Sequence, residues 1–225
     1  TFDFMLSNPP FGVEWKKIEA VVRKEYEQKG FAGRFGPGLP RVSDGSLLFL
    51  LHLISKMRPA EEGGSRIGIV LNGSPLFTGG AGSGESEIRK WIIENDWLEC
   101  IVALPKDMFY NTPIQTYVLI LDNKKPEHKR GKVLLVDGTK FASRLPKNFG
   151  DKTNFISDDS IGLITRLYGA NTNGPHSKVL EIDDFKYVQF PIHRAFRISY
   201  LISESSVEVA IESKHFSKRT LSERE

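Results

Sequence analysis

The chain has 225 residues, of which 40% are hydrophobic and 26% are charged, and its formal net charge is +3. This composition is ordinary for a globular protein and excludes disorder of the whole chain, while the mild basicity falls short of the basic stripe of an autonomous DNA-binding domain. No apolar run approaches the ~20 residues of a membrane helix, and no secretory leader opens the sequence. We therefore expect a cytoplasmic protein that has no contact with a membrane.

Cysteine and histidine usage argues against disulfide and metal chemistry. The single cysteine, Cys100, lies in the apolar run WLECIVAL, which is typical of a small buried hydrophobic residue. The five histidines are scattered without the spacing of metal ligands, and we predict no metal site. His52, in an apolar helical stretch, is expected to be packed in the core rather than catalytic.

Strand-like and helical patterns alternate over the first 121 residues, which predicts a layered α/β fold with a largely parallel sheet. The predicted strands, whose near-continuous hydrophobicity favours burial on both faces, are Phe2–Leu6, Arg66–Leu71, Leu98–Leu104 and Ile114–Leu121. The predicted helices are Trp15–Tyr26, Ser46–Met57 and Ser86–Asn95, the last with Ser83 as its N-cap. Since the chain starts without methionine at a strand, we expect it to be a piece of a longer protein.

The last two predicted strands are separated by about ten residues without a helical pattern, so they are expected to pair antiparallel as a long hairpin. The basic segment 124–132 that follows is either a solvated connector or a phosphate contact, and a further strand, KVLLVDG, comes next. Beyond residue 140 the pattern predicts a C-terminal extension, with a helix capped at Ser157, extended pieces at Lys186–Ile198 and a polar, weakly helical end at Glu204–Glu225.

The motif Asn8-Pro9-Pro10-Phe11 directly follows the first predicted strand, at the strand end where doubly wound sheets bind ligands. The two prolines restrict the backbone, so the Asn8 side chain and the Pro9 carbonyl are held rigidly. Together these two oxygens are able to accept both hydrogens of an exocyclic or amide nitrogen, and Phe11 offers a ring on which a flipped base stacks. The motif therefore favours methyl transfer to an amino group, without a metal or a proton donor. A simple turn after a strand is the alternative.

The sequence resembles the modification subunits of type I restriction-modification systems, which are adenine-N6 DNA methyltransferases. The similar segments are FDFMLSNPPFG, SDGSLLFLLHLISKM, RIGIVLNGSPLFTGGAGSGESEIRKWIIENDWLECIVALP and MFYNTPIQTYVLIL, followed by segments of the extension, and the likeness runs from Phe2 to about Leu201. The resemblance implies a partial doubly wound, Rossmann-like sheet ending in an antiparallel hairpin, with residues 1–140 as the C-terminal half of the catalytic domain. Residues 141–225 are expected to be a mixed C-terminal extension whose polar tail docks on a partner subunit or DNA.

The resemblance also implies roles for particular residues. Asn8 and Pro9 orient the adenine amine, Pro10 shapes the turn beside cofactor and base, and Phe11 stacks on the base. The residues implied to line the base pocket are Phe109, Thr112 and Ile114. Asn72, at a strand end facing the same cleft, is either a further pocket residue or a turn former, and we favour the turn. Pro113 departs from the glycine that is frequent in this family and is expected to stiffen the loop.

The implied methyl donor is S-adenosylmethionine, with Asn8 and Pro10 at its edge, but no cofactor loop precedes Asn8 and none follows the motif. TGGAGSGE lacks the spacing of a cofactor loop, and a flexible surface loop is favoured. We therefore expect the chain alone to be inactive, with the main cofactor loop upstream. The implied partners are DNA, a specificity subunit and a restriction subunit.

Two other functions remain open from the sequence. The rival activity is an RNA or protein-glutamine N-methyltransferase, and the rival of another class is a non-catalytic DNA-binding or scaffold subunit of the same fold. Phe11 argues against the glutamine-modifying enzymes, which generally carry tyrosine there. Arg194 and Arg197, on either side of Phe196, either contact a partner or cover apolar surface.

Overall fold

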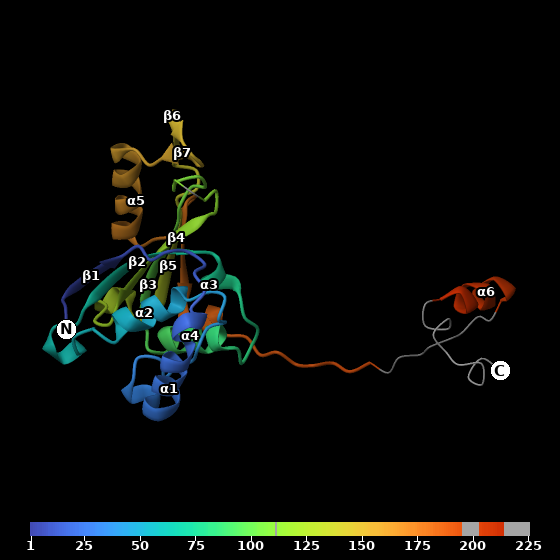
Figure 1. Ribbon diagram of the computed structural model, residues 1–225. Coiled ribbons are helices and arrows are strands. Elements are labelled where there is room, and N and C mark those ends of the chain that lie inside the picture. Colours follow the sequence, from blue (N-terminus) through green and yellow to red (C-terminus); the bar gives the residue numbers. More distant parts are fainter. Residues whose placement is uncertain (111, 195–202, 214–225) are drawn as a thin grey trace. The chain divides into compact units, whose positions relative to one another are not determined.

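The computed structural model describes residues 1–110, 112–194 and 203–213, within two compact units, Thr1–Tyr187 and Val188–Glu225. In the smaller unit, the described residues include the helix α6 (Glu204–Glu212), which begins after Ser203, whose hydroxyl accepts a hydrogen bond from a backbone amide of the first turn. The elements below belong to the larger unit (Figure 1). Within the described ranges, no helix is both long enough and apolar enough to span a bilayer.

A six-stranded mixed sheet forms the centre of the larger unit, with its strands in the order β1-β2-β4-β3-β5-β8. The strands are β1 (Phe4–Ser7), β2 (Arg66–Asn72), β3 (Leu98–Ala103), β4 (Thr116–Asp122), β5 (Lys132–Asp137) and β8 (Ser177–Glu181). β1, β2, β3 and β5 run in one direction, whereas β4 and β8 are antiparallel to their neighbours. The predicted antiparallel pairing of β3 with β4 is confirmed, and β4 additionally inserts between β2 and β3.

Helices cover both faces of this sheet, as a doubly wound fold predicts (Figure 1). One face packs against α1 (Glu19–Lys29), α2 (Ser46–Ile54) and α4 (Gly84–Glu94), with the short α3 (Ser74–Phe77) beside them. The other face packs against α5 (Asp158–Ala170). Side chains alternate between the two faces along each strand, so the fully buried Ile69 faces the first group of helices and Val102 faces α5.

Two predicted helix starts are confirmed at the level of single atoms. The Ser83 hydroxyl accepts a hydrogen bond from the backbone amide of Ser86, and the Ser157 hydroxyl accepts one from Ser160. Acidic residues follow in both first turns, where they interact favourably with the positive end of the helix dipole. These caps set where α4 and α5 begin.

The prediction that the first strand is buried on both faces is wrong. Met5 is buried, but Phe4 is 77% exposed and Leu6 is 90% exposed, because β1 is an edge strand and no described element of this chain covers that side of it. The apolar stripe of the first predicted helix is also only partly buried: Val22 packs in the core, whereas Val21 is exposed. Apolar periodicity thus marks these elements correctly but overstates their burial.

The basic segment 124–132 is not simply solvated, and two of its lysines are structural. Lys125 donates a hydrogen bond to Asp96 at 2.6 Å, and its side chain is 2% exposed. Lys129 donates one to the buried Glu99 at 2.7 Å. Both amines are held inside the fold. The basic groups of this segment that face solvent belong to its exposed residues, such as Lys124.

The predicted extension contributes to the same unit as the sheet. Its strand β8 pairs antiparallel with β5, and a separate two-stranded hairpin forms from β6 (Ser143–Phe149) and β7 (Lys152–Phe155), which the sequence patterns did not predict. No strand forms in the described part of Lys186–Ile198, and residues 195–198, with Phe196 and Arg197, lie outside the described residues. The boundary after residue 140 between the catalytic domain and a C-terminal extension stays a prediction.

Candidate functional site

The motif residues lie where the sequence placed them, directly beyond the carboxyl end of β1. β1 ends at Ser7, and Asn8 to Phe11 form the loop that follows. Pro9 is buried, whereas the side chains of Asn8 and Pro10 are exposed. Within the described part of the chain, the Asn8 side chain makes no hydrogen bond, so both polar groups of its amide are free to bind a ligand.

The loop between β3 and β4 reaches the same edge of the sheet and touches the motif. The rings of Phe11 and Phe109 meet edge to face, with centroids 5.2 Å apart and planes at 84°. This is a favourable aromatic geometry. Two residues that the sequence analysis proposed separately, about a hundred positions apart, are therefore neighbours, and each remains only half-buried.

The rest of this loop is compact but only partly buried. Thr112 forms an isolated antiparallel bridge with Phe109, and the backbone amide of Ile114 lies 3.5 Å from the Thr112 hydroxyl. Pro113 is exposed. Thr112 and Ile114 thus lie shortly after Phe109 in the same loop, and their role in a base pocket stays a prediction.

Asn72 is not a turn former, because it is the last residue of β2 and pairs in register with Thr116, the first residue of β4. Its side-chain oxygen is buried and has no hydrogen-bond partner within the described residues, and the same holds for the fully buried hydroxyl of Thr116. Buried polar atoms are normally satisfied by protein, water or ligand. Thr116 was not predicted from the sequence, since a threonine that opens a strand carries no distinctive pattern.

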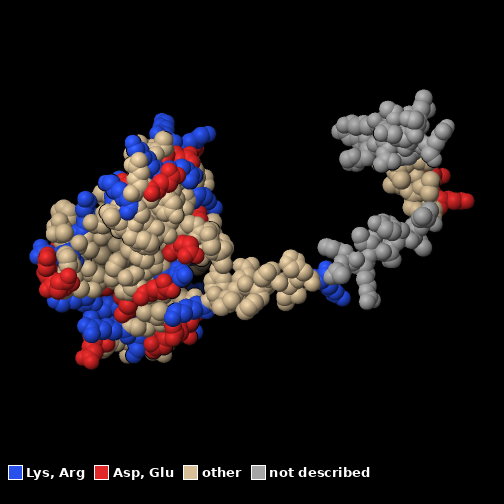
Figure 2. All heavy atoms as spheres, turned by 90° about the horizontal axis from the view of Figure 1, so that it is seen from below, with Lys and Arg blue, Asp and Glu red and all other residues tan. Residues whose placement is uncertain are grey.

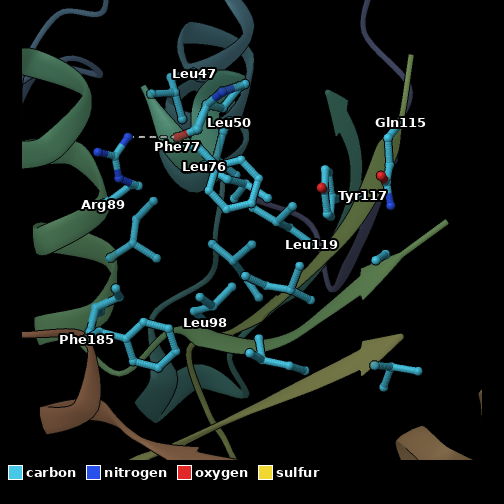
Figure 3. Close-up of a pocket in the computed structure, with 18 of the residues that line it drawn as sticks. Leu47, Leu50, Leu76, Phe77, Arg89, Leu98, Gln115, Tyr117, Leu119 and Phe185 are labelled. Atoms are coloured by element: carbon cyan, nitrogen blue, oxygen red, sulfur yellow. Dashed lines mark hydrogen bonds between the residues drawn. The ribbon is translucent and has the colours of Figure 1, made fainter. Parts of the chain in front are cut away.

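A large cavity lies elsewhere, between the sheet and the helices α2, α3 and α4 (Figure 3). It has a volume of about 630 Å³ and an almost wholly apolar lining. Leu76, Phe77, Tyr117, Leu119 and Phe185 surround it. Neither Asn8 nor Phe109 borders this cavity. Its hydrocarbon walls do not fit the amino-acid and ribose groups of S-adenosylmethionine.

The glycine-rich segment TGGAGSGE forms a surface loop before α4, and Arg89 holds its start. The Arg89 guanidinium donates hydrogen bonds to the carbonyls of Pro75, Thr78 and Gly79, one of which is drawn in Figure 3. Burial lowers the pKa of Arg89. Two of these bonds hold the start of the loop and the third holds α3, so Arg89 has a structural role at this segment.

Two further predictions about single residues have different outcomes. Cys100 is fully buried, and burial raises the pKa of its thiol to about 12, which confirms it as an inert core residue. His52 is exposed on α2, with its ring nitrogen Nδ1 3.3 Å from Arg34, so the prediction of a core histidine is wrong. Burial of the ring and the neighbouring Arg34 lower its pKa.

On one face of the larger unit, charges of both signs are mixed rather than gathered in one stripe (Figure 2). On the face shown in Figure 2, lysine and arginine side chains lie among aspartate and glutamate side chains around an uncharged area. In the described ranges, no group of three or more histidine, cysteine, aspartate or glutamate side chains is placed to hold a metal ion. The polar groups at the motif itself are neutral.

Comparisons with known proteins find methylase subunits of type I restriction enzymes among the relatives of this chain. The methylase subunits of the type I restriction enzymes MjaVIII and MjaIX of Methanocaldococcus jannaschii are 31% and 26% identical to this chain over 64% and 100% of its length. The chain spans only 24% and 40% of the lengths of these two relatives. The type I restriction-modification methyltransferase subunit of Streptococcus thermophilus superposes on 81% of the chain and 35% of its own length, with a TM-score of 0.65 and 25% identity.

The model of a family described as N-6 DNA Methylase matches residues 1–193, which include the motif loop, the whole sheet and the loop that carries Phe109. The match covers most of the chain and contains every residue that the geometry brings together at the carboxyl edge. The chain belongs to the N-6 DNA methylase family.

Proposed function

We propose that this chain is the base-binding part of the modification subunit of a type I restriction-modification system, which transfers a methyl group from S-adenosylmethionine to adenine N6 in DNA. The observation that carries the proposal is the contact between Phe11 of the motif loop and Phe109 of the β3–β4 loop. It joins an amine-binding motif to an aromatic surface at the carboxyl edge of the sheet.

Asn8 and Pro9 hold the amino group of the target base. The Asn8 side-chain oxygen and the Pro9 carbonyl accept the two hydrogens of adenine N6, which concentrates electron density on the nitrogen and directs its lone pair toward the methyl donor. Neutral acceptors are sufficient, because the nitrogen is methylated as a neutral amine and releases one proton to water only after the new C–N bond has formed. The exposed, unbonded Asn8 amide fits this role.

Phe11 and Phe109 supply the surface on which a flipped adenine rests. Both rings are half-buried, so each is anchored in the protein and still presents hydrocarbon to a ligand. Stacking of a base on an aromatic side chain contributes roughly 1–3 kcal/mol, which offsets part of the cost of extruding the base from the duplex. Thr112, Ile114 and Asn72 line the same pocket.

S-adenosylmethionine supplies the methyl group when it is bound, and its site needs residues beyond these 225. The described residues do not form a cradle for it, since the large cavity is apolar and lies away from Asn8. Asn8 and Pro10 form only the base-side edge of such a site. The small share of the relatives' length that this chain spans supports a cofactor-binding part elsewhere in the protein.

The proposed partners are DNA, a specificity subunit and a restriction subunit. The curated relatives are named as methylase subunits of type I restriction enzymes, which supports an assembly of several subunits for this protein as well. A cytoplasmic location goes with chromosomal DNA as the substrate.

The test is methyl transfer by the full-length protein in its complex, with Asn8→Ala compared with Asn95→Ala. Asn8→Ala is expected to lower the transfer rate by roughly 100-fold or more, the scale of losing one hydrogen bond specific to the transition state. Asn95 is the exposed residue directly after α4, and its loss removes one local hydrogen bond, so its variant is expected to retain activity. Both variants are expected to keep the wild-type melting temperature.

The substrate is tested in the same assay with DNA, RNA and a glutamine-containing protein offered separately. Transfer to DNA with N6-methyladenine as the product is the expected result. Transfer to RNA or to glutamine instead contradicts the proposed substrate, and unchanged DNA methylation by Asn8→Ala contradicts the catalytic role of the motif and favours a scaffold function.

A further inference from the structure

The hairpin of β6 and β7 lies outside the main sheet and beside the loop that carries Phe109 (Figure 1). An isolated two-stranded hairpin is at best marginally stable, and most of β6 is exposed. The folded conformation of the hairpin therefore depends on its contacts with the β3–β4 loop.

Four hydrogen bonds fasten the hairpin to that loop. The carbonyl of Asp107 accepts from the backbone amides of Thr153 and Asn154, both at 3.1 Å, and the carbonyl of Tyr110 accepts from the amide of Asp151 at 3.0 Å. The Asn154 side chain donates a further bond to the carbonyl of the residue before Asp107, at 3.0 Å. The hairpin and the loop are thus held together as one structural unit, directly beside Phe109.

Glycine is required where this element is tightest. Gly150, in the turn between β6 and β7, has a φ of +59°, and a β-carbon there would come 2.7 Å from the carbonyl oxygen of Tyr110. Any other residue would push the hairpin away from the loop. The close approach is therefore a specific feature of this sequence.

Two exposed aromatic rings lie at this junction. Tyr110 is 59% exposed and Phe149 is 52% exposed, and their ring centroids are 6.3 Å apart. The ammonium of Lys152 lies 5.0 Å from the centre of the Tyr110 ring. Exposed aromatic rings interleaved with cations are typical of surfaces that bind unstacked bases and the phosphates around them.

The hairpin segment is strongly basic compared with the rest of the chain. The stretch 138–155 carries four basic residues (Lys140, Arg144, Lys147, Lys152) and one acidic residue (Asp151), a formal charge of +3, which equals that of the whole chain. Arg144 and Lys147 are exposed, and within the described residues neither forms an ion pair. Their charges are not used to stabilise the fold.

We propose that Tyr110 and the β6–β7 hairpin form a DNA-binding surface beside the base pocket. Arg144 and Lys147 bind phosphates of the duplex, and the Tyr110–Phe149 pair stacks on the partner base that is left unpaired when the target adenine is flipped. This inference rests on the proposed function, since it takes DNA as the substrate. The position next to Phe109, the unpaired positive charge and the exposed rings together favour DNA over a protein partner.

The phosphate contacts are tested by the salt dependence of DNA binding to the assembled full-length complex. The duplex carries the DNA sequence that the complex methylates, which is identified beforehand by long-read detection of N6-methyladenine. The slope of log affinity against log salt is negative, and each lost phosphate contact reduces its magnitude by about 0.9. Arg144→Gln/Lys147→Gln is therefore expected to reduce that magnitude by about two.

The matched control is Lys17→Gln/Lys24→Gln, which removes the same charge from exposed positions in and just before α1, at the far end of the larger unit (Figure 1). Its slope is expected to match the wild type. Equal slopes for both double variants overturn the proposal. So does loss of subunit assembly by Arg144→Gln/Lys147→Gln with an unchanged slope, which would make the surface a protein-binding site.

The stacking role is tested with Phe149→Ala on two duplexes, one intact and one with an abasic site opposite the target adenine. We expect binding of the intact duplex to weaken roughly 5- to 100-fold, as for other stacked bases, and binding of the abasic duplex to change little. Phe31→Ala, at an exposed phenylalanine that also touches one aromatic ring, is the control for general effects on folding. Equal losses on both duplexes, or none, overturn the stacking role.

Failure of this inference is separable from failure of the proposed function. If the wild-type complex methylates adenine in DNA and the hairpin variants bind DNA as it does, only the inference is wrong. If the wild-type complex does not methylate DNA at all, the proposed function itself is wrong.

Discussion

Lys129→Met is predicted to be strongly destabilising, because it leaves the carboxylate of Glu99 buried without its main partner. Glu99 lies at a β-bulge of β3 and is 2% exposed. One of its oxygens accepts hydrogen bonds from Lys129 at 2.7 Å and from the Tyr168 hydroxyl at 2.9 Å, while the other faces the Arg66 guanidinium at 3.5 Å without a hydrogen bond. Burial and the bond to Glu99 raise the pKa of Tyr168.

Breaking a buried ion pair by removing one partner typically costs about 3–5 kcal/mol. Lys129 also lies 4.3 Å from the centre of the Tyr168 ring, so the loss of a cation–π contact adds to this cost. For a unit of this size about 2–4 °C of melting temperature corresponds to 1 kcal/mol, which gives a fall of roughly 6–20 °C. Lys124→Met, in the same segment but exposed, is expected to change the free energy of unfolding by less than about 0.5 kcal/mol.

Urea unfolding of the purified protein measures both variants and the double variant Glu99→Leu/Lys129→Met. Replacing the charged pair by hydrocarbon leaves no buried charge, and Arg66 keeps its hydrogen bond to Asp122 at 2.6 Å. The double variant is therefore expected to recover most of the lost stability, except for about 1 kcal/mol from the Tyr168 hydroxyl. A Lys129→Met variant as stable as Lys124→Met, or a double variant less stable than the single one, would refute this reasoning.

Three further predictions concern the ion pair between Glu25 of α1 and Arg34, the start of α4 and the buried thiol. The hydrogen bonds from Arg34 lower the pKa of Glu25 from 4.5 to about 2, so their stabilisation is present above pH 4.5 and lost as the pH falls through 2. Because Arg34 is partly exposed, Glu25→Gln is expected to cost about 1–2 kcal/mol at pH 7 and nothing below pH 2 in chemical unfolding, and an equal cost at both pH values would contradict this. Gly84→Ala is expected to lower the melting temperature sharply, because its β-carbon would overlap a backbone carbonyl, whereas Gly80→Ala points into open space and serves as the control. Cys100 is expected to react with a thiol reagent only as fast as the protein unfolds, and rapid labelling of the native state would disprove its burial.

The elements that could be predicted from sequence are those set by local chemistry. Serine before an acidic turn predicts a helix start because the hydroxyl binds a free amide, and Ser83 and Ser157 do this. The antiparallel pairing of β3 with β4 follows from a connection that contains no crossover helix. Asn8 was predicted from its motif, and Phe109 from the resemblance to the family. The structure brings their two loops together.

The features that could not be predicted depend on partners distant in sequence. The exposure of Phe4 reflects its place at the edge of the sheet, which strand periodicity does not encode. The burial of Lys129 requires a carboxylate thirty positions earlier, at a bulge that no local pattern signals. The β6–β7 hairpin has little apolar alternation, because hydrogen bonds to the Asp107 carbonyl rather than a core hold it in place.

The insertion of β4 between β2 and β3 explains why the candidate site forms at all. Since β4 runs antiparallel to both neighbours, its first residue, Thr116, lies at the edge where β1 and β2 end. The loop before Thr116 therefore returns to the motif loop, and Phe109 reaches Phe11 without a crossover. With a parallel β4, the same loop would have to cross to the opposite edge, where Arg66 and Asp122 meet. The direction of one strand thus decides whether the Phe109 ring meets the motif loop.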